Sequence, residues 1–192
     1  MNLQHVNIKL FLKPNGSIDL EALVPVFHSW IQDRVCDELL LDVADYRHVP
    51  AGPGVVLIGL QADYGVDNTD DRLGVRYNRK ASLDGSNQDR LRQAARAALT
   101  ACQRLEADPR LRGKLQFNGQ EIEIFVNDRL FAPNTDATRD AAAPDLRDFS
   151  QKLFGGSEYS LSYNTDPRRL FTAFVKAARP FPVADLLRNL SA

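Results

Sequence analysis

Apolar and polar positions alternate from the start of the chain, and the period of this pattern predicts the first two elements. Every second residue is apolar over 6–12, which predicts a strand with one buried face. Over 20–31 the apolar residues recur at spacings of three and four, which predicts a helix capped by Ser17 or Asp19. Because proline removes a backbone donor and crowds the preceding turn, Pro25 predicts a kink or a late start in this helix.

Two stretches farther along the chain share one order of features, which we interpret as an internal repeat. The two units cover roughly residues 55–107 and 121–178. Each contains an alternating apolar strand, the tripeptide Asn-Thr-Asp at 68–70 or 134–136, a second strand that ends in Tyr-Asn, and a segment with helical spacing. The repeat therefore predicts the order strand, loop, strand, helix twice, with the second helix beginning at Arg169.

The remaining segments add further predictions. The continuous apolar run over 38–43 is typical of a strand in the middle of a sheet. Asn118-Gly119 lies between alternating segments and favours a type I′ hairpin, because both central residues of that turn need positive φ. Helical spacing predicts a long helix over 88–106 and a short one over 183–190. One segment, 136–144, has the composition of a disordered linker.

Strands and helices are mixed in the predicted order without strict alternation. This order predicts an α+β fold, in which helices pack on one face of a mostly antiparallel, mixed sheet to form a two-layer sandwich. We expect a ferredoxin-like arrangement with the strand–strand–helix duplication, in a single domain over residues 1–192. A doubly wound parallel fold is the alternative. The short hairpin connections disfavour it, because parallel strands need long crossovers.

Composition narrows the classes of function. The hydrophobic fraction is 44%, the charged fraction 26% and the net charge −1, as in an ordinary globular domain. Nucleic-acid binding is disfavoured because cationic surface drives it. No apolar run approaches the roughly 18 residues of a membrane span, and the first residues lack the pattern of a secretion signal. We therefore expect a cytoplasmic protein without a membrane partner. Arginine outnumbers lysine by 18 to 6, from which we expect a bacterial origin.

The cysteines and histidines show no ligand spacing. Cys36 and Cys102 lack the Cys-x-x-Cys pattern of redox and zinc sites, and we expect two buried thiols. His5, His28 and His48 are far apart in the sequence, and no two have the helical spacing of metal ligands. We therefore expect neither a metal nor a cofactor.

An aspartate-rich loop is the first candidate for chemistry. Four carboxylates fall within nine residues, enough for a hard cation such as Ca²⁺ or Mg²⁺: Asp63, Asp67, Asp70 and Asp71. The spacing begins like an EF-hand loop, but Asn68 stands where that loop needs its turn glycine and Gly74 where it needs its closing glutamate. A solvated turn whose side chains bond their own backbone is the favoured reading, and ligand binding by Asp63, Asp67 and Asp70 is the alternative.

Two further sets of residues are weaker candidates. Asp45, Arg47 and His48 follow a predicted strand, where a histidine near a carboxylate can act as a general base and an arginine can hold an anion. An ion-paired surface loop is the alternative. Tyr77 and Tyr163 end corresponding strands of the two units. If exposed, they would contact one ligand symmetrically. If buried, they would be strand residues with one polar tip.

The long predicted helix carries arginines along one side. Arg92, Arg96 and Arg104 share this side, and Arg110, Arg112 and Lys114 follow beyond the helix. These basic residues could face nucleic acid or an acidic partner. A solvated helix face is favoured, because interspersed acidic residues and a net charge near zero weaken the field.

Together these features favour a non-catalytic module that works through protein–protein contacts and self-associates as a homo-oligomer. The motivation is that the apolar pattern is well specified, whereas every chemical motif is incomplete. The alternative is a small-ligand-binding protein or enzyme, with a polar site near the loops at 42–48 and 63–71.

Overall fold

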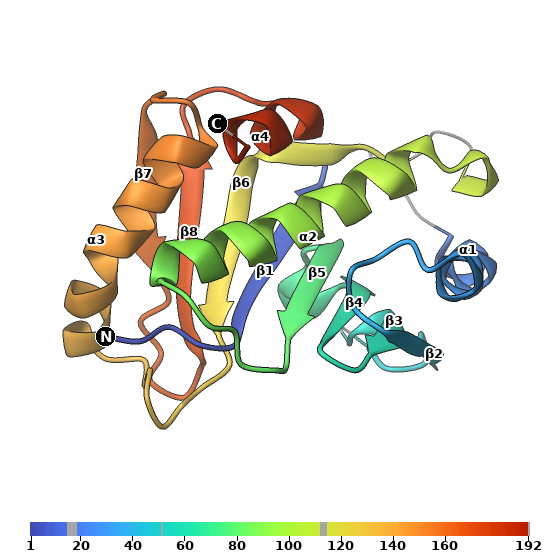
Figure 1. The fold of residues 1–192 in the computed structure, drawn as a ribbon, viewed down its shortest axis with the longest axis horizontal. Coiled ribbons are helices and arrows are strands. Elements are labelled where there is room, and N and C mark those ends of the chain that lie inside the picture. The colour runs from blue at the N-terminus through green and yellow to red at the C-terminus, as the bar shows by residue number, and fades with distance from the viewer. Residues whose placement is uncertain (15–18, 51, 112–114, 192) are drawn as a thin grey trace.

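The described residues of the chain form an α+β fold with one sheet of eight antiparallel strands and four α-helices (Figure 1). The computed structural model describes residues 1–14, 19–50, 52–111 and 115–191, so Ser17, Arg112 and Lys114 lie outside the described residues. The strands are β1 (Val6–Leu12), β2 (Leu40–Tyr46), β3 (Gly54–Gly59), β4 (Ala62–Asp67), β5 (Gly74–Arg79), β6 (Phe117–Val126), β7 (Tyr159–Tyr163) and β8 (Phe171–Ala177). The helices are α1 (Leu20–Asp33), α2 (Asn87–Ala107), α3 (Asp136–Leu153) and α4 (Val183–Asn189), with short 3-10 turns η1 (Thr69–Asp71) and η2 (Pro109–Leu111). The prediction of an α+β fold is confirmed.

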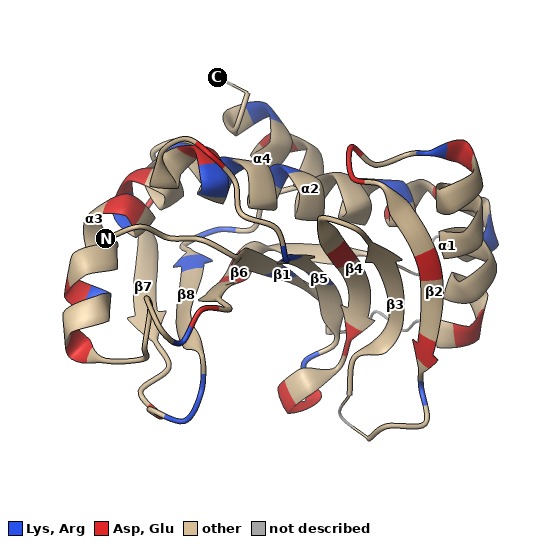
Figure 2. Ribbon diagram, turned by 60° about the horizontal axis from the view of Figure 1, so that its bottom comes forward, with Lys and Arg blue, Asp and Glu red and all other residues tan. Residues whose placement is uncertain are grey.

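The sheet and the helices form two layers. The strand order is β2-β3-β4-β5-β1-β6-β8-β7, and each neighbouring pair is antiparallel. Helix α2 crosses β1 and β5, α1 packs on β2 and β3, α3 on β7 and β8, and α4 on β6. All four helices lie on one side of the sheet, and the other side curves inward (Figure 2).

The apolar alternation explains which face of the sheet is covered. Ile8 and Leu10 on β1 are almost completely buried under the helices, so the residues between them point to the opposite face. Many alanines on α2 let this helix approach the sheet closely. The helix begins at a capping box, in which the Asp89 N–H donates to Ser86 Oγ and the Ser86 N–H donates to the Asp89 carboxylate.

The predicted helix from Arg169 is wrong, because residues 171–177 form strand β8. The apolar residues of this segment fit period two as well as helical spacing, and β8 pairs with β6 on one side and β7 on the other. Asp166 caps a turn: its carboxylate accepts the Arg168 N–H at 3.0 Å. In the second repeat unit, strand β8 occupies the position that α2 has in the first unit. The structure therefore does not confirm the ferredoxin-like duplication.

The predicted hairpin at Asn118-Gly119 is also wrong. Strand β6 continues through this dipeptide beside β1. Leu10 pairs with Ile122, whereas the next residue, Phe11, pairs with Asn118, so β6 has extra residues at this point that form a bulge. A Cβ on Gly119 would lie 2.1 Å from the carbonyl oxygen of Phe181. The glycine serves this close approach and not a turn.

Three other segments differ from the sequence-based expectation in their place in the sheet, their structure or their starting residue. The run over 38–43 leads into β2, which lies at one end of the sheet and not in its middle. Residues 136–144 belong to α3. Helix α1 begins at Leu20, before Pro25, and its cap is Asp19, whose carboxylate accepts the Glu21 N–H. The helices predicted over 88–106 and 183–190 are confirmed as α2 and α4.

Within the described ranges, no helix has both the length and the apolar character that crossing a membrane requires.

Candidate functional site

The inward-curved face of the sheet carries a row of charged side chains. Arg76 on β5 pairs in register with Lys9 on β1, and Lys9 pairs with Glu123 on β6. Because side chains alternate between the two faces, all three point away from the helices. The row therefore places two cations and one carboxylate on three adjacent strands in the middle of the sheet.

A buried ion pair lies at the centre of this row. The Lys9 ammonium contacts the Asp67 carboxylate, and the two side chains are only 3% and 2% exposed. The Thr69 hydroxyl donates to Asp67 at 2.7 Å, and Arg76 Nη1 lies 3.4 Å from the same carboxylate. Burial acts to raise the pKa of Asp67, but Lys9 and the hydrogen bonds outweigh burial and hold the pKa below its ordinary value. Asp67 is therefore ionised at neutral pH.

Two arginines on this face have their guanidinium groups over phenyl rings. The guanidinium carbon of Arg72 lies 3.6 Å from the ring centre of Phe11, and that of Arg76 lies 4.5 Å from the ring centre of Phe125. Arg72 also donates to Glu121 at 2.8 Å. A guanidinium over a ring keeps its N–H groups at its edge, and those not bonded to Glu121 or Asp67 can donate to the oxygens of a carboxylate or a phosphate. Both arginines are therefore pre-oriented donors.

Glu123 differs from the other carboxylates of the row. It is half-buried, and within the described part of the chain it forms no hydrogen bond or ion pair. Burial raises the pKa of the Glu123 carboxyl above its ordinary value, although the charges of Lys9 and Arg76 act in the opposite direction. A half-buried carboxyl with a raised pKa can accept a proton from a bound molecule or donate one to it.

These side chains line a pocket of about 280 Å³, which we call the basic pocket. Five basic and three acidic side chains line it: Lys9, Arg72, Arg76, Arg129 and Arg169, and Asp67, Asp70 and Glu123. Asp70 in η1 bonds Arg169 from the β7–β8 connection at 2.7 Å. In Figure 2, η1 and this connection project on either side of the inward-curved face. The ion pair thus links two loops that are distant in the sequence.

A second pocket of about 210 Å³ adjoins the basic pocket, and we call it the β4 pocket. Its lining residues come mainly from β4 and its neighbours: Pro53, Val56, Asp63, Tyr64, Gly65, Asp67, Arg76 and Asn78. Asp67 and Arg76 line both pockets. The two cavities therefore share one wall.

The aspartate-rich candidates divide between these pockets. Asp67 and Asp70 line the basic pocket, and Asp63 and Asp67 line the β4 pocket. Across the described ranges, no three His, Cys, Asp or Glu side chains gather closely enough to hold a metal ion. The structure brings these aspartates together with basic side chains, an arrangement that suits an anion.

The second candidate set lies elsewhere. Arg47 donates to Asp45 at 2.8 Å, and this bond lowers the pKa of Asp45 to about 2. Arg47 also lies 3.5 Å from Glu21, and the His48 ring faces Tyr46. None of these side chains lines the basic pocket or the β4 pocket.

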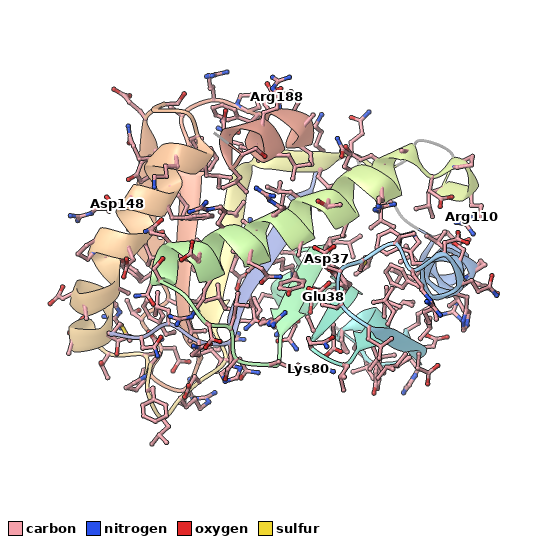
Figure 3. The ribbon with its side chains drawn as sticks, viewed as in Figure 1. Asp37, Glu38, Lys80, Arg110, Asp148 and Arg188 are labelled. Carbon is pink, nitrogen blue, oxygen red and sulfur yellow. The ribbon has the colours of Figure 1, made fainter. Side chains whose placement is uncertain are left out.

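The two tyrosines face the helical layer. Tyr77 is completely buried, and its hydroxyl donates to Glu38 at 2.7 Å, as does that of Tyr64. Glu38 comes from the segment before β2 and lies close to β5 and α2 (Figure 3). Tyr163 stacks on Phe171, and its hydroxyl has no partner among the described residues. Neither tyrosine lies on the face that carries the pockets.

The sequence did not reveal Lys9, Arg72, Arg76 or Glu123 as site residues. The available signal was a lysine in the centre of a strand whose only other polar residue is Asn7, since lysine is almost never fully buried unless paired. Its partner Asp67 is 58 positions away, and only the strand order brings the two together.

Comparison with known proteins places the chain in no family: no protein-family model matches it, and no curated protein matches its sequence.

Proposed function

We propose that this protein binds a small anionic molecule, one bearing a phosphate, sulfate or carboxylate group, in the basic pocket. The observation that carries the proposal is the pair of arginines, Arg72 and Arg76, whose guanidinium groups lie over phenyl rings beside a buried lysine. Guanidinium groups fixed in this way lose little entropy when they bind two oxygens of one anion. The proposal develops the alternative that placed a polar site near residues 63–71.

The buried charges support this reading because a stable sheet does not need them. Removing a lysine and an aspartate from water costs several kcal/mol per ion, and their attraction often no more than offsets that cost. Perturbed carboxyl groups gathered in a cleft are characteristic of functional sites. Asp67, with a lowered pKa, and Glu123, with a raised pKa, lie in the same pocket.

Isothermal titration calorimetry with sulfate and with inorganic phosphate tests the proposal. We expect Arg76→Gln to weaken binding of both ions by about 10- to 100-fold, the loss expected for one hydrogen bond to a charged group. Arg92→Gln is the matched control, because Arg92 is an exposed arginine on α2, in the other layer. Equal affinities of the wild type and Arg76→Gln, or equal losses in both variants, would contradict the proposal.

Protein–protein contact through self-association is the second candidate function. Leu39, Leu41 and Leu60 are each more than half exposed beside β2, and exposed apolar clusters often mark interfaces. Pairing of two β2 edges from different chains is disfavoured, because the carboxylates of Asp42 and Asp45 already accept the N–H groups of Val43 and Arg47 at this edge.

The mass in solution tests this second candidate. Light scattering coupled to size exclusion should give a multiple of the 21.5 kDa chain mass if the exposed leucines form an interface. Leu41→Lys should then restore the single-chain mass. A single-chain mass for the wild type at high concentration would remove this candidate. A homo-oligomeric state, a cytoplasmic location and a bacterial origin remain predictions beside it.

A further inference from the structure

The β4 pocket differs from the basic pocket in its chemistry. Besides Tyr64 and the shared Asp67 and Arg76, its polar side chains are those of Asp63 and Asn78, and Pro53 and Val56 supply apolar surface. Lys80, at the end of β5 (Figure 3), lies 2.7 Å from Asp63 and balances its charge. Hydroxyl groups suit such a lining because they both donate to carboxylates and accept from amides, while the C–H groups beside them pack on apolar side chains.

The two pockets share side chains, so one ligand could contact both of them. Arg76 and Asp67 line both cavities, so a molecule whose anionic group reaches Arg76 in the basic pocket stands at the entrance of the β4 pocket. Asn78 Nδ2 lies 3.4 Å from Asp63, a long contact that leaves the amide able to bond a ligand. Each cavity alone, at about 280 Å³ and about 210 Å³, is smaller than the roughly 300–1,000 Å³ of a typical small-molecule site, so a ligand of that size would occupy both.

We infer that the anion is carried by a soluble polyol such as a sugar phosphate, with the phosphate in the basic pocket and the hydroxyl groups in the β4 pocket. This inference rests on the proposed function and names the ligand class for that same site. Asp63 and Asn78 are the specificity-determining side chains, and Arg72 and Arg76 hold the phosphate.

Gly65 offers a way to close the β4 pocket alone. It lines that pocket but not the basic pocket, and a Cβ built on it would come no closer than 3.6 Å to any neighbouring atom. Valine is favoured in strands, so Gly65→Val should fold and fill the cavity. Asn78→Ala is the second variant, which removes a polar contact without filling the cavity.

Calorimetry with ribose 5-phosphate, inorganic phosphate and ribose tests the inference. We expect the wild type to bind ribose 5-phosphate about tenfold more tightly than phosphate, as one or two added hydrogen bonds would give. Gly65→Val and Asn78→Ala should lose this preference while their affinity for phosphate stays unchanged. Ribose alone should bind far more weakly than its phosphate.

The two proposals fail in different ways. If ribose 5-phosphate and phosphate bind the wild type equally, or if both variants keep the tenfold preference, the polyol inference is overturned and anion binding stands. If neither phosphate nor ribose 5-phosphate binds, the proposed function is overturned together with the inference.

Discussion

Replacing Asp67 by asparagine would leave the ammonium of Lys9 buried without its ion-pair partner, and the Glu123 carboxyl on the neighbouring strand would be the remaining acidic group beside it. Lys9 is 3% exposed, so hydration from the basic pocket replaces only part of the lost carboxylate interaction. Removing one partner of a buried ion pair costs about 3–5 kcal/mol of unfolding free energy, because an uncompensated charge remains. We expect Asp67→Asn to be destabilised by about 3 kcal/mol, the lower end of this range, since asparagine can still accept the Thr69 hydroxyl.

The double variant Lys9→Met, Asp67→Asn should recover most of that loss. Methionine replaces the lysine stem with an apolar chain that fills irregular space, and neither position of the former ion pair carries a charge. Apolar replacement of a buried pair is often neutral or stabilising. We therefore expect the double variant to lie within about 1 kcal/mol of the wild type, and to have lost anion binding.

Urea unfolding followed by circular dichroism measures the unfolding free energies of the wild type, Asp67→Asn and the double variant. The comparison holds when the dependence of the unfolding free energy on urea concentration has the same slope in all three proteins. The dependence on pH provides an internal check. The folded pKa of Asp67 is lowered, so its stabilising contribution is present above the unfolded pKa of about 3.9 and is lost as the pH falls through the folded pKa. The wild type and Asp67→Asn should converge in that acidic range. A double variant as unstable as the single variant would refute the reasoning.

Three other predictions follow from the same contacts. Glu123→Gln should bind sulfate more tightly than the wild type at pH 7, because it lacks the negative charge of Glu123. The affinity of the variant should not change with pH, whereas the affinity of the wild type should rise as the pH falls through the raised pKa of Glu123. Equal pH profiles of the two proteins in calorimetry would contradict an effect of the Glu123 charge on anion binding. Cys102 is buried as expected, whereas Cys36 is only half-buried. Both should react slowly with a thiol reagent at pH 8 in the folded protein and rapidly in urea, because burial raises the pKa of Cys36 to about 11 and that of Cys102 well above its ordinary value. Fast labelling of both thiols in the native protein would contradict these raised pKa values. Gly119→Ala should lower stability by about 1–3 kcal/mol, since its Cβ would overlap the Phe181 carbonyl oxygen, and an unchanged thermal midpoint would show that β6 does not pass there.

The sequence pattern predicted elements best where one period had no competitor. The strand over 6–12 and the helix over 88–106 each follow a single period, and both are present as β1 and α2. Residues 171–177 fit both periods. They form a strand because β6 and β7 offer backbone partners on either side, which local spacing does not reveal. Asn118-Gly119 has the preferred residues of a turn, but tertiary packing uses its glycine for a close backbone approach.

The candidate site was predictable only in part, for a related reason. Counting carboxylates identified Asp67 and Asp70, which do line the basic pocket. The cations that face them come from strands and loops up to 99 positions away. Arg76, Lys9 and Glu123 meet because β1 lies between β5 and β6, and register of this kind is a property of the whole sheet.

An NMR titration of the isotope-labelled wild-type protein with sulfate tests the central claim most directly, because it reports where the ion binds. We expect saturable shifts of the side-chain Nε–H signals of Arg72 and Arg76 and of the Thr69 amide, all on the inward-curved face of the sheet. The exposed arginine Arg92 on α2 should not shift. Shifts confined to α2, or a linear drift of all arginines without saturation, would contradict an anion site in the basic pocket.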